Sequence, residues 1–443
     1  MSDAPEKAAE PVAPALERSN GRWARLRRVL ADTEALRYPD YRRLFIGNAV
    51  SFVGIQLTGV AVPVQMWQIT HSSSWVGLLG MAALIPLIGF GLWGGAVADA
   101  VDRRRLLLGS QLLAWVVTLL LFVQALAHAD SPPLLLSLIA VQSAAFAVAS
   151  PTRSAIIPRL LPLRVVPAAN TLSFTASSLS AFIGPLLAGV VLARWSYGAA
   201  YAIDASLFTV AMYATLRLPQ LEPTGERATR PGLRSVVQGL AYIGVRPVLA
   251  MSFVADLIAM VLANPRALYP EMADRRFGGE HAVGWLYASI ALGAVAGGLF
   301  SGWVSRVRRQ GMAITASIAV WGLAVAFAGF AHALWLVVLL LAASGAADLV
   351  SATFRQTILQ VYAPDEMRGR LQGVFIVTVA GGPRLGDLRA GAMGAALGAS
   401  TAWIAGGFAC AVVMVLVAFL VPTFLRYDAA APEPAEAATD TAG

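Results

Sequence analysis

The chain has 443 residues, of which 58% are hydrophobic and 13% are charged. An average soluble domain carries roughly 25% charged residues, so this composition excludes an ordinary soluble protein and indicates a membrane protein. The formal charge of +8 comes almost entirely from arginines, which are scattered along the chain without a recognisable nucleic-acid-binding module, so we expect no nucleic-acid partner.

The first 43 residues are polar, basic and rich in alanine and proline, and they contain no recognisable cleavable signal peptide. Within them, residues 22–36 place Trp23 and Leu26 on one helical face and arginines on the others. This pattern is typical of a short interfacial helix, and it fits a basic leader that stays in the cytoplasm equally well. We expect residues 1–43 to form a cytoplasmic tail.

Apolar segments of membrane-spanning length then follow one another along the chain. About 20 apolar residues, at a rise of 1.5 Å each, span the ~30 Å hydrocarbon core of a bilayer. The sequence therefore predicts an all-α membrane protein with about twelve transmembrane helices, placed at 44–69, 75–98, 106–128, 133–154, 168–193, 198–217, 247–268, 283–304, 311–331, 334–356, 371–394 and 400–425.

The longest polar stretch between these segments lies at the centre of the chain. Residues 219–231 mix proline, glycine, glutamate and arginine without apolar periodicity, which indicates a flexible connection. We accordingly expect an N-terminal six-helix half at 44–217, a cytoplasmic linker at 218–246 and a C-terminal six-helix half at 247–426. Residues 427–443 are rich in alanine, proline and glutamate and are expected to form a disordered cytoplasmic tail.

The two halves share landmarks in the same order. The pair Gly94-Gly95 and the arginines after it recur as Gly297-Gly298 and a second arginine cluster, and Gly184-Pro185 recurs as Gly382-Pro383. An internal repeat of this length predicts two pseudo-symmetric six-helix bundles. Glycines four residues apart let helices approach closely, so we expect those in the second and eighth segments to form contacts between the halves.

Arginines gather in alternate connections, as in Arg103 to Arg105 and Arg306 to Arg309. The intervening connections, such as 70–74 and 128–133, hold none, although two outer connections depart from this pattern: one holds Arg194 and the other is the stretch at 269–282. Positive residues in short loops stay in the cytoplasm. We therefore expect a multi-pass protein of the bacterial inner membrane with both termini in the cytoplasm.

The loop GGAVADAVDRRR, Gly94 to Arg105, resembles the motif between the second and third helices of the major facilitator superfamily, apart from Ala100, where a basic residue often stands. The stretches NPRALYPEMADRRFGG from Asn264 and PDEMRGRLQGVF from Pro364 resemble the branch that includes the enterobactin exporter and actinobacterial multidrug efflux proteins. This resemblance implies two parallel six-helix halves and secondary transport.

The same resemblance implies a gating role for Asp99 at a helix end, together with Asp102, Arg103, Arg104 and Arg105. The arginines fit the positive-inside rule almost as well, so both interpretations stay open. In the second half Gly302 takes the position of Asp99, which leaves that repeat without the gating carboxylate.

Carboxylates inside the spans are candidates for transport chemistry, because an ionised acid at the bilayer centre costs at least ~2.5 kcal/mol. Asp256 lies at the middle of the seventh segment, and a proton site, a substrate contact and a structural hydrogen bond are all open for it. Asp348 shares a helix face with Arg355, seven residues later. A gate, an ion-pair network and a part in the transport chemistry are all open for these two residues.

Two further sets of polar residues stand in the spans. Arg384 and Asp387 are three residues apart, a spacing that lets the charges meet on one helix face as a structural pair or as part of the transport chemistry. Asp204 is expected near the membrane surface in a capping or solvated role. Gln56, Gln65 and Trp67 on the first segment are candidates for lining a central, mostly apolar cavity.

The four histidines are scattered, the single cysteine lies in an apolar run and no phosphate-binding loop is present. We therefore expect no catalytic residues, no metal, no cofactor and no enzymatic activity. The sequence predicts a monomeric secondary transporter that exports a small amphipathic molecule, a siderophore-like metabolite or a drug, by proton antiport and alternating access. A nutrient importer and a non-transporting membrane receptor are the alternatives.

Overall fold

A computed structural model describes residues 33–220 and 233–428 of the chain, without the side chains of 92–100, 233–236, 305, 365–366, 368–369 and 376. Residues 22–32 of the possible interfacial helix at 22–36 therefore lie outside the described residues, as do the centre of the linker and most of the C-terminal tail.

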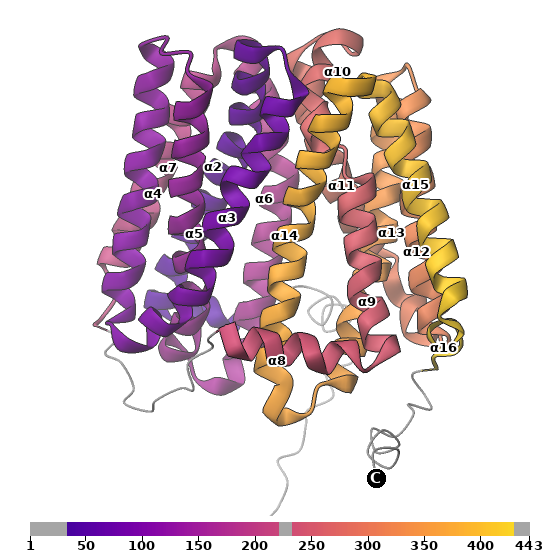
Figure 1. Cartoon of the computed structure of the whole chain (residues 1–443). Helices are drawn as coiled ribbons and strands as arrows, with labels where there is room; N and C mark the ends of the chain where they lie inside the picture. Colours follow the sequence, from indigo (N-terminus) through magenta and orange to yellow (C-terminus); the bar gives the residue numbers. More distant parts are fainter. Residues whose placement is uncertain (1–32, 221–232, 429–443) are drawn as a thin grey trace, which may run out of the picture.

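The described residues form two bundles of long helices (Figure 1). The N-terminal half contains α2 (Pro39–Thr70), α3 (Ser73–Ala100), α4 (Arg103–Leu126), α5 (Pro132–Leu160), α6 (Val166–Arg194) and α7 (Tyr197–Leu216). The C-terminal half contains α9 (Pro247–Leu257), α10 (Tyr269–Arg276), α11 (Glu280–Leu299), α12 (Gln310–Phe330), α13 (Leu334–Tyr362), α14 (Asp365–Leu397), α15 (Ala399–Leu420) and α16 (Pro422–Arg426).

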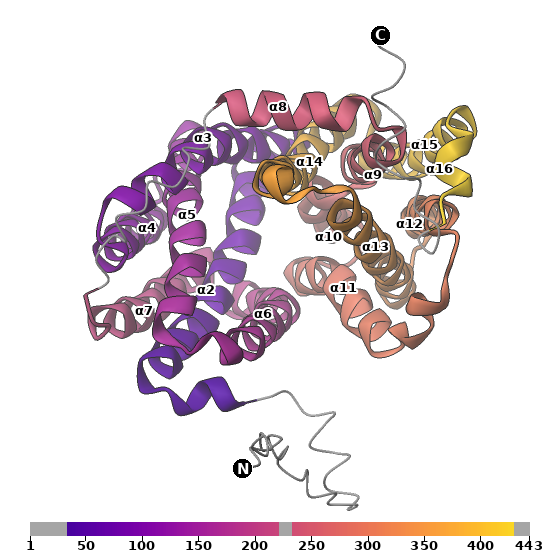
Figure 2. The same cartoon turned by 90° about the horizontal axis from the view of Figure 1, so that it is seen from below.

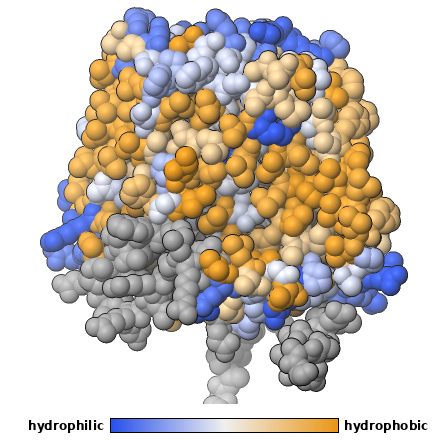
Figure 3. All heavy atoms as spheres, in the orientation of Figure 1, coloured by the Kyte–Doolittle hydropathy of each residue, from blue (hydrophilic) through white to orange (hydrophobic). Residues whose placement is uncertain are grey.

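Among the described residues, eleven helices are long and apolar enough to cross a membrane. The predicted span at 371–394 falls inside α14, a 33-residue helix that is not one of the eleven and that carries Arg384, Asp387 and Arg389. Figure 3 shows an apolar band around the middle of the molecule with polar residues towards both ends. The fold is thus an all-α membrane protein, as the sequence predicts.

Two short helices mark opposite ends of the molecule, which we call the α8 end and the α10 end (Figure 1). The helix α8 (Leu233–Gly244) lies across one end, in the segment expected to be a linker, where Tyr242 Oη donates to Tyr362 O at 2.9 Å. Its 12 residues are too few to span a bilayer, so the helix connects the halves without crossing. The helix α10 lies at the other end, in the connection at 269–282.

The seventh span is interrupted near its middle. The helix α9 ends at Leu257 and continues as a π-helical turn, Ile258–Leu262, before Asn264 and Pro265. Proline disfavours a helical conformation of the residue before it, which explains why the helix stops here. The interruption follows Asp256 directly, and π-helical turns are frequent at functional sites.

Candidate functional site

The two halves meet mainly along two helix pairs, α3 with α14 and α6 with α11, as the view from the α8 end shows (Figure 2). On α3, a Cβ at Gly80 would lie 2.7 Å from Arg384 O of α14, and one at Gly77 would lie 2.6 Å from Asp387 O. Further along α3, on the same helix face as Gly77 and Gly80, a Cβ at Gly91 would meet no atom within 4 Å. The pair α3 and α14 is therefore in close contact towards the α10 end and open near Gly91.

The pair α6 and α11 has the same asymmetry. Towards the α10 end, a Cβ at Gly189 would lie 2.9 Å from Gly284 Cα, so only glycines permit this approach. Towards the α8 end, Phe174 is 70% exposed and Leu299 is 80% exposed. The halves are closed against each other at the α10 end and separated at the α8 end.

The glycines that the sequence singled out on the second and eighth segments lie elsewhere. A Cβ at Gly297 would lie 3.0 Å from Ala346 Cβ of α13, and Gly293 likewise packs against Ala342 of α13. Gly91 and Gly302 meet nothing within 4 Å. The expectation of half-to-half contacts is wrong for Gly293 and Gly297, because the crossing of α11 with α13 turns them into the C-terminal half, and neither Gly91 nor Gly302 makes such a contact in this structure.

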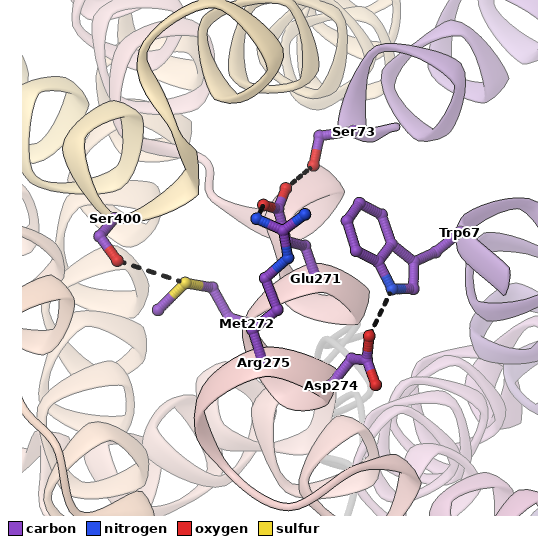
Figure 4. A network of polar contacts seen from close by, with 7 residues as sticks. All are labelled: Trp67, Ser73, Glu271, Met272, Asp274, Arg275 and Ser400. Atoms are coloured by element: carbon purple, nitrogen blue, oxygen red, sulfur yellow. Dashed lines mark hydrogen bonds and ion pairs between the residues drawn. The ribbon is translucent and has the colours of Figure 1, made fainter. Parts of the chain in front are cut away.

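Polar side chains close the interface at the α10 end (Figure 4). Trp67 Nε1 at the end of α2 donates to Asp274 Oδ2 of α10 at 3.1 Å. Ser73 Oγ at the start of α3 donates to Glu271, which also pairs with Arg275 at 3.0 Å. The guanidinium of Arg275 lies 5.3 Å from the centre of the Trp67 ring, within reach of a cation–π contact.

Further contacts extend this set on either side. Gln68 Nε2 of α2 donates to Glu280 Oε1 of α11 at 2.9 Å. Ser400 Oγ of α15 lies 3.7 Å from Met272 Sδ, which ties α10 to its own half (Figure 4). We call Trp67, Gln68, Ser73, Glu271, Asp274, Arg275 and Glu280 the α10-end network.

A buried charge cluster lies inside the C-terminal half. Arg355 Nη1 of α13 donates to Asp256 Oδ1 of α9, and Arg355 Nη2 lies 3.6 Å from Asp348 Oδ1. Asp256 and Arg355 are each 4% exposed. Asp256 Oδ2 has no hydrogen-bond partner among the described residues. Two acids therefore share one arginine, and one carboxylate oxygen is left without a donor.

Arg384 and Asp387 do not form the pair that their spacing allowed. Among the described residues no ion pair joins them, and Asp387 Oδ1 instead accepts from Asn264 Nδ2 at 3.2 Å. The same amide nitrogen donates to Pro383 O at 3.0 Å. Arg384 is exposed, whereas Asp387 lies against the interrupted seventh span. The neighbouring span therefore decides the contact of Asp387.

The three candidates for the cavity wall lie in three different surroundings. Gln65 is fully buried inside the N-terminal half, where it exchanges hydrogen bonds with Gln124 and accepts one from Tyr201 Oη at 2.7 Å. Trp67 belongs to the α10-end network, and Gln56 is half-buried against Gly184. Gln65 is thus not a cavity residue, because its helix face points into its own bundle.

Asp204 corrects another expectation. It is fully buried between α2 and α7, where Thr58 Oγ1 donates to Asp204 Oδ2 at 2.5 Å. A Cβ at Gly54 would collide with the carboxylate, so the absence of a side chain there makes room for it. A solvated or capping role near the membrane surface is therefore wrong for Asp204.

The arginine-rich loop lies at the α8 end. Asp102 Oδ1 accepts from the Arg105 backbone N–H at 2.9 Å and so caps α4. Arg103 Nη1 donates to Ala155 O of α5 at 3.4 Å, and Arg104 Nη2 donates to Leu216 O at the end of α7 at 2.6 Å. Such contacts with terminal carbonyls stabilise helix ends. The side chain of Asp99 lies outside the described set, and the gating role of this loop stays a prediction.

Comparisons with known proteins agree with this architecture. Residues 32–439 match the model of a family described as transmembrane secretion effector. The enterobactin exporter EntS of Shigella boydii serotype 18 is 28% identical over 403 residues, which cover 89% of this chain and 95% of that protein. EntS of Escherichia coli O81 is 28% identical over the same length.

Solved transporters share the fold. The nucleoside transporter NupG superposes with a TM-score of 0.70 at 15% identity over 88% of this chain and 100% of that chain. A bacterial homologue of the lysosomal transporter Spinster, described as inward-facing and unoccupied, gives 0.69 at 14% identity over 89% and 98%. With the family match, they identify a transporter and not an enzyme: the chain belongs to the transmembrane secretion effector family of the major facilitator superfamily.

Proposed function

We propose that this transporter exports a small amphipathic molecule, a siderophore-like metabolite or a drug, across the bacterial inner membrane by proton antiport. Two comparisons support export: the family is described by secretion, and relatives at 28% identity are enterobactin exporters. The direction of transport and the class of substrate are carried over from these relatives as a proposal.

The proposed orientation puts the α8 end, and with it both termini, in the cytoplasm. The arginines at the start of α4, Arg159 in the last turn of α5 and Arg164 after α5 lie at that end, and positive residues favour the cytoplasmic side. In this orientation the halves are closed towards the outside and separated towards the cytoplasm. Such an arrangement suits the loading of a substrate from inside the cell.

The observation that carries the proposal of proton coupling is the cluster of Asp256, Arg355 and Asp348. Two carboxylates beside one guanidinium leave a net negative charge at a site where Asp256 and Arg355 are buried and Asp348 is partly exposed, and a proton removes that charge. Because the cluster joins α9 to α13, proton binding would change the contact between these two helices. A change of this kind biases one conformation over the other.

Export is tested by mass-spectrometric profiling of cells and medium, with and without iron limitation. Three strains are compared: a deletion strain and the same strain complemented with the wild-type chain or with Asp256→Asn. We expect a compound to accumulate in the deletion and Asp256→Asn cells and to return to the medium with the wild-type chain. The proposal of export fails if the wild-type chain instead depletes the compound from the medium, or if no endogenous compound or added lipophilic drug changes its distribution.

A further inference from the structure

A polar niche lies in the N-terminal half at the α8 end, separate from the charge cluster of the C-terminal half. It has a volume of about 230 Å³ and is lined by α2, α5 and α6. We call it the Arg153 niche and define it by Asn48, Phe52, Ser150, Arg153, Asn170 and Ser173. None of the residues that line it is acidic.

Arg153 lacks the carboxylate partner that Arg43 and Arg164 have at this end. Arg43 pairs with Asp40 at 2.9 Å, and Arg164 pairs with Glu34 at 3.2 Å. No carboxylate among the described residues pairs with Arg153, and its guanidinium carbon lies 5.1 Å from the centre of the Phe52 ring, within reach of a cation–π contact. Arg153 Nε is buried without a hydrogen-bond partner. A cation inside a membrane span is costly and is retained mainly where it faces a cavity or a partner.

The niche faces the space between the halves. On the adjacent α6, Thr171, Phe174 and Thr175 are exposed, and the two threonine hydroxyls are bonded only to carbonyls of their own helix. The helix α6 packs against α11 of the other half, and the halves are separated at the α8 end, so these exposed side chains border the space between the halves. A molecule that enters from the α8 end can therefore reach Arg153.

The chemistry around Arg153 selects for an anion with an aromatic body. A guanidinium binds a carboxylate or a comparable pair of oxygens through two parallel hydrogen bonds, which are stronger than neutral ones. The amides of Asn48 and Asn170 can donate to or accept from further oxygens. Phe52 and the exposed Phe174 offer apolar ring surface beside the charge. The volume suits one ring-sized group rather than a whole large molecule.

We propose that the Arg153 niche binds an anionic, oxygen-bearing aromatic group of the exported molecule and so determines which substrates are loaded. This inference rests on the proposed export function, for which it names the substrate class. Arg153 would bind the anion, and Asn170 and Ser173 would position it.

The test uses salicylate and salicylamide, two ring-sized probes that differ in charge at neutral pH. Equilibrium binding of each radiolabelled probe is measured on the full chain purified in lipid nanodiscs. We expect the wild-type chain to bind salicylate at least tenfold more tightly than salicylamide. Arg153→Gln should weaken salicylate binding at least tenfold and leave salicylamide binding unchanged, while Arg153→Lys should give an intermediate loss.

The matched control is Arg217→Gln, which removes the same charge at the same end but outside the niche, and which should keep the preference for salicylate. If Arg153→Gln does not fold, Asn170→Ala and Ser173→Ala serve instead and should weaken the binding of salicylate. The inference is overturned if the wild-type chain binds neither probe, binds both equally, or keeps its preference in the Arg153→Gln chain.

Failure of this inference differs from failure of export. If the wild-type strain moves a compound into the medium but the chain shows no preference for salicylate, export stands and the niche is not the binding site. If the preference exists and depends on Arg153 but no compound changes its distribution between cells and medium, the niche stands and the export function is wrong.

Discussion

Arg355 of α13 binds Asp256 of α9 across 99 residues of sequence, and the contact lies inside the C-terminal half. Arg355 also lies 3.6 Å from Asp348, so three charges meet at a site where Asp256 and Arg355 are buried and the Asp348 side chain is 31% exposed. Because Asp256 adjoins the π-helical turn of the seventh span, a change in this pair acts where the helix is already irregular.

Asp256→Asn should abolish transport against a gradient and leave downhill exchange intact, because the amide cannot release or take up a proton. The measurement uses proteoliposomes with and without an imposed pH gradient and the compound identified by profiling. Asp204→Asn is the matched control, because it removes a buried acid from the other half. If Asp256→Asn still concentrates substrate, the proton assignment is wrong.

Arg355→Gln should destabilise the chain by about 3–5 kcal/mol, because it leaves a buried carboxylate without its cation. The double substitution Asp256→Asn with Arg355→Gln should cost less than the sum of the two single changes, since the uncompensated charge is gone. Unfolding of the purified chain in mixed micelles measures both effects. Additive losses would show that the two side chains are not energetically coupled.

Gly80→Leu should prevent closure at the α10 end, because its side chain would meet the backbone of α14 at Arg384. The chain should insert normally but lose transport, and hydrogen exchange should rise in residues 60–85. Gly91→Leu, on the same face of the same helix, meets open space and should be tolerated. Equal effects of the two substitutions would contradict the observed asymmetry of the interface.

Asp274→Ala removes the acceptor of the Trp67 hydrogen bond in the α10-end network. The loss of one such bond is worth about 1 kcal/mol, which shifts the balance between closed and open forms by roughly fivefold. Hydrogen exchange at the end of α2 should report this shift. Asp130→Ala, another exposed acid at the same end, should leave the exchange unchanged, and a shift of similar size there would argue against a specific role of Asp274.

Gln65→Leu should lower stability without changing the set of transported compounds, because Gln65 bonds Gln124 and Tyr201 inside the N-terminal half. Leaving those buried polar groups unsatisfied costs about 1–3 kcal/mol. Thermal unfolding and the profiling assay measure the two properties separately. An altered substrate profile at unchanged stability would show instead that Gln65 lines the substrate cavity.

The sequence by itself determined the class of fold and the family. The transfer of an apolar helix into lipid depends on the composition of that one segment, so the spans, the doubling of the chain and the motif Gly94 to Arg105 could be found without a structure. Even α14 could be placed, although its charges make it less apolar than the other long helices.

Only the tertiary structure decided which side chains meet. The rotation and crossing of each helix turn Gln65 and Asp204 into their own bundle. They also place Asp387 where it accepts a hydrogen bond from Asn264, and Asp256 where it accepts one from Arg355. These contacts depend on neighbours more than a hundred residues away in three of the four cases, and a pattern within one segment carries no information about them. The helices α8 and α10 escaped prediction because they are too short to give a membrane signal.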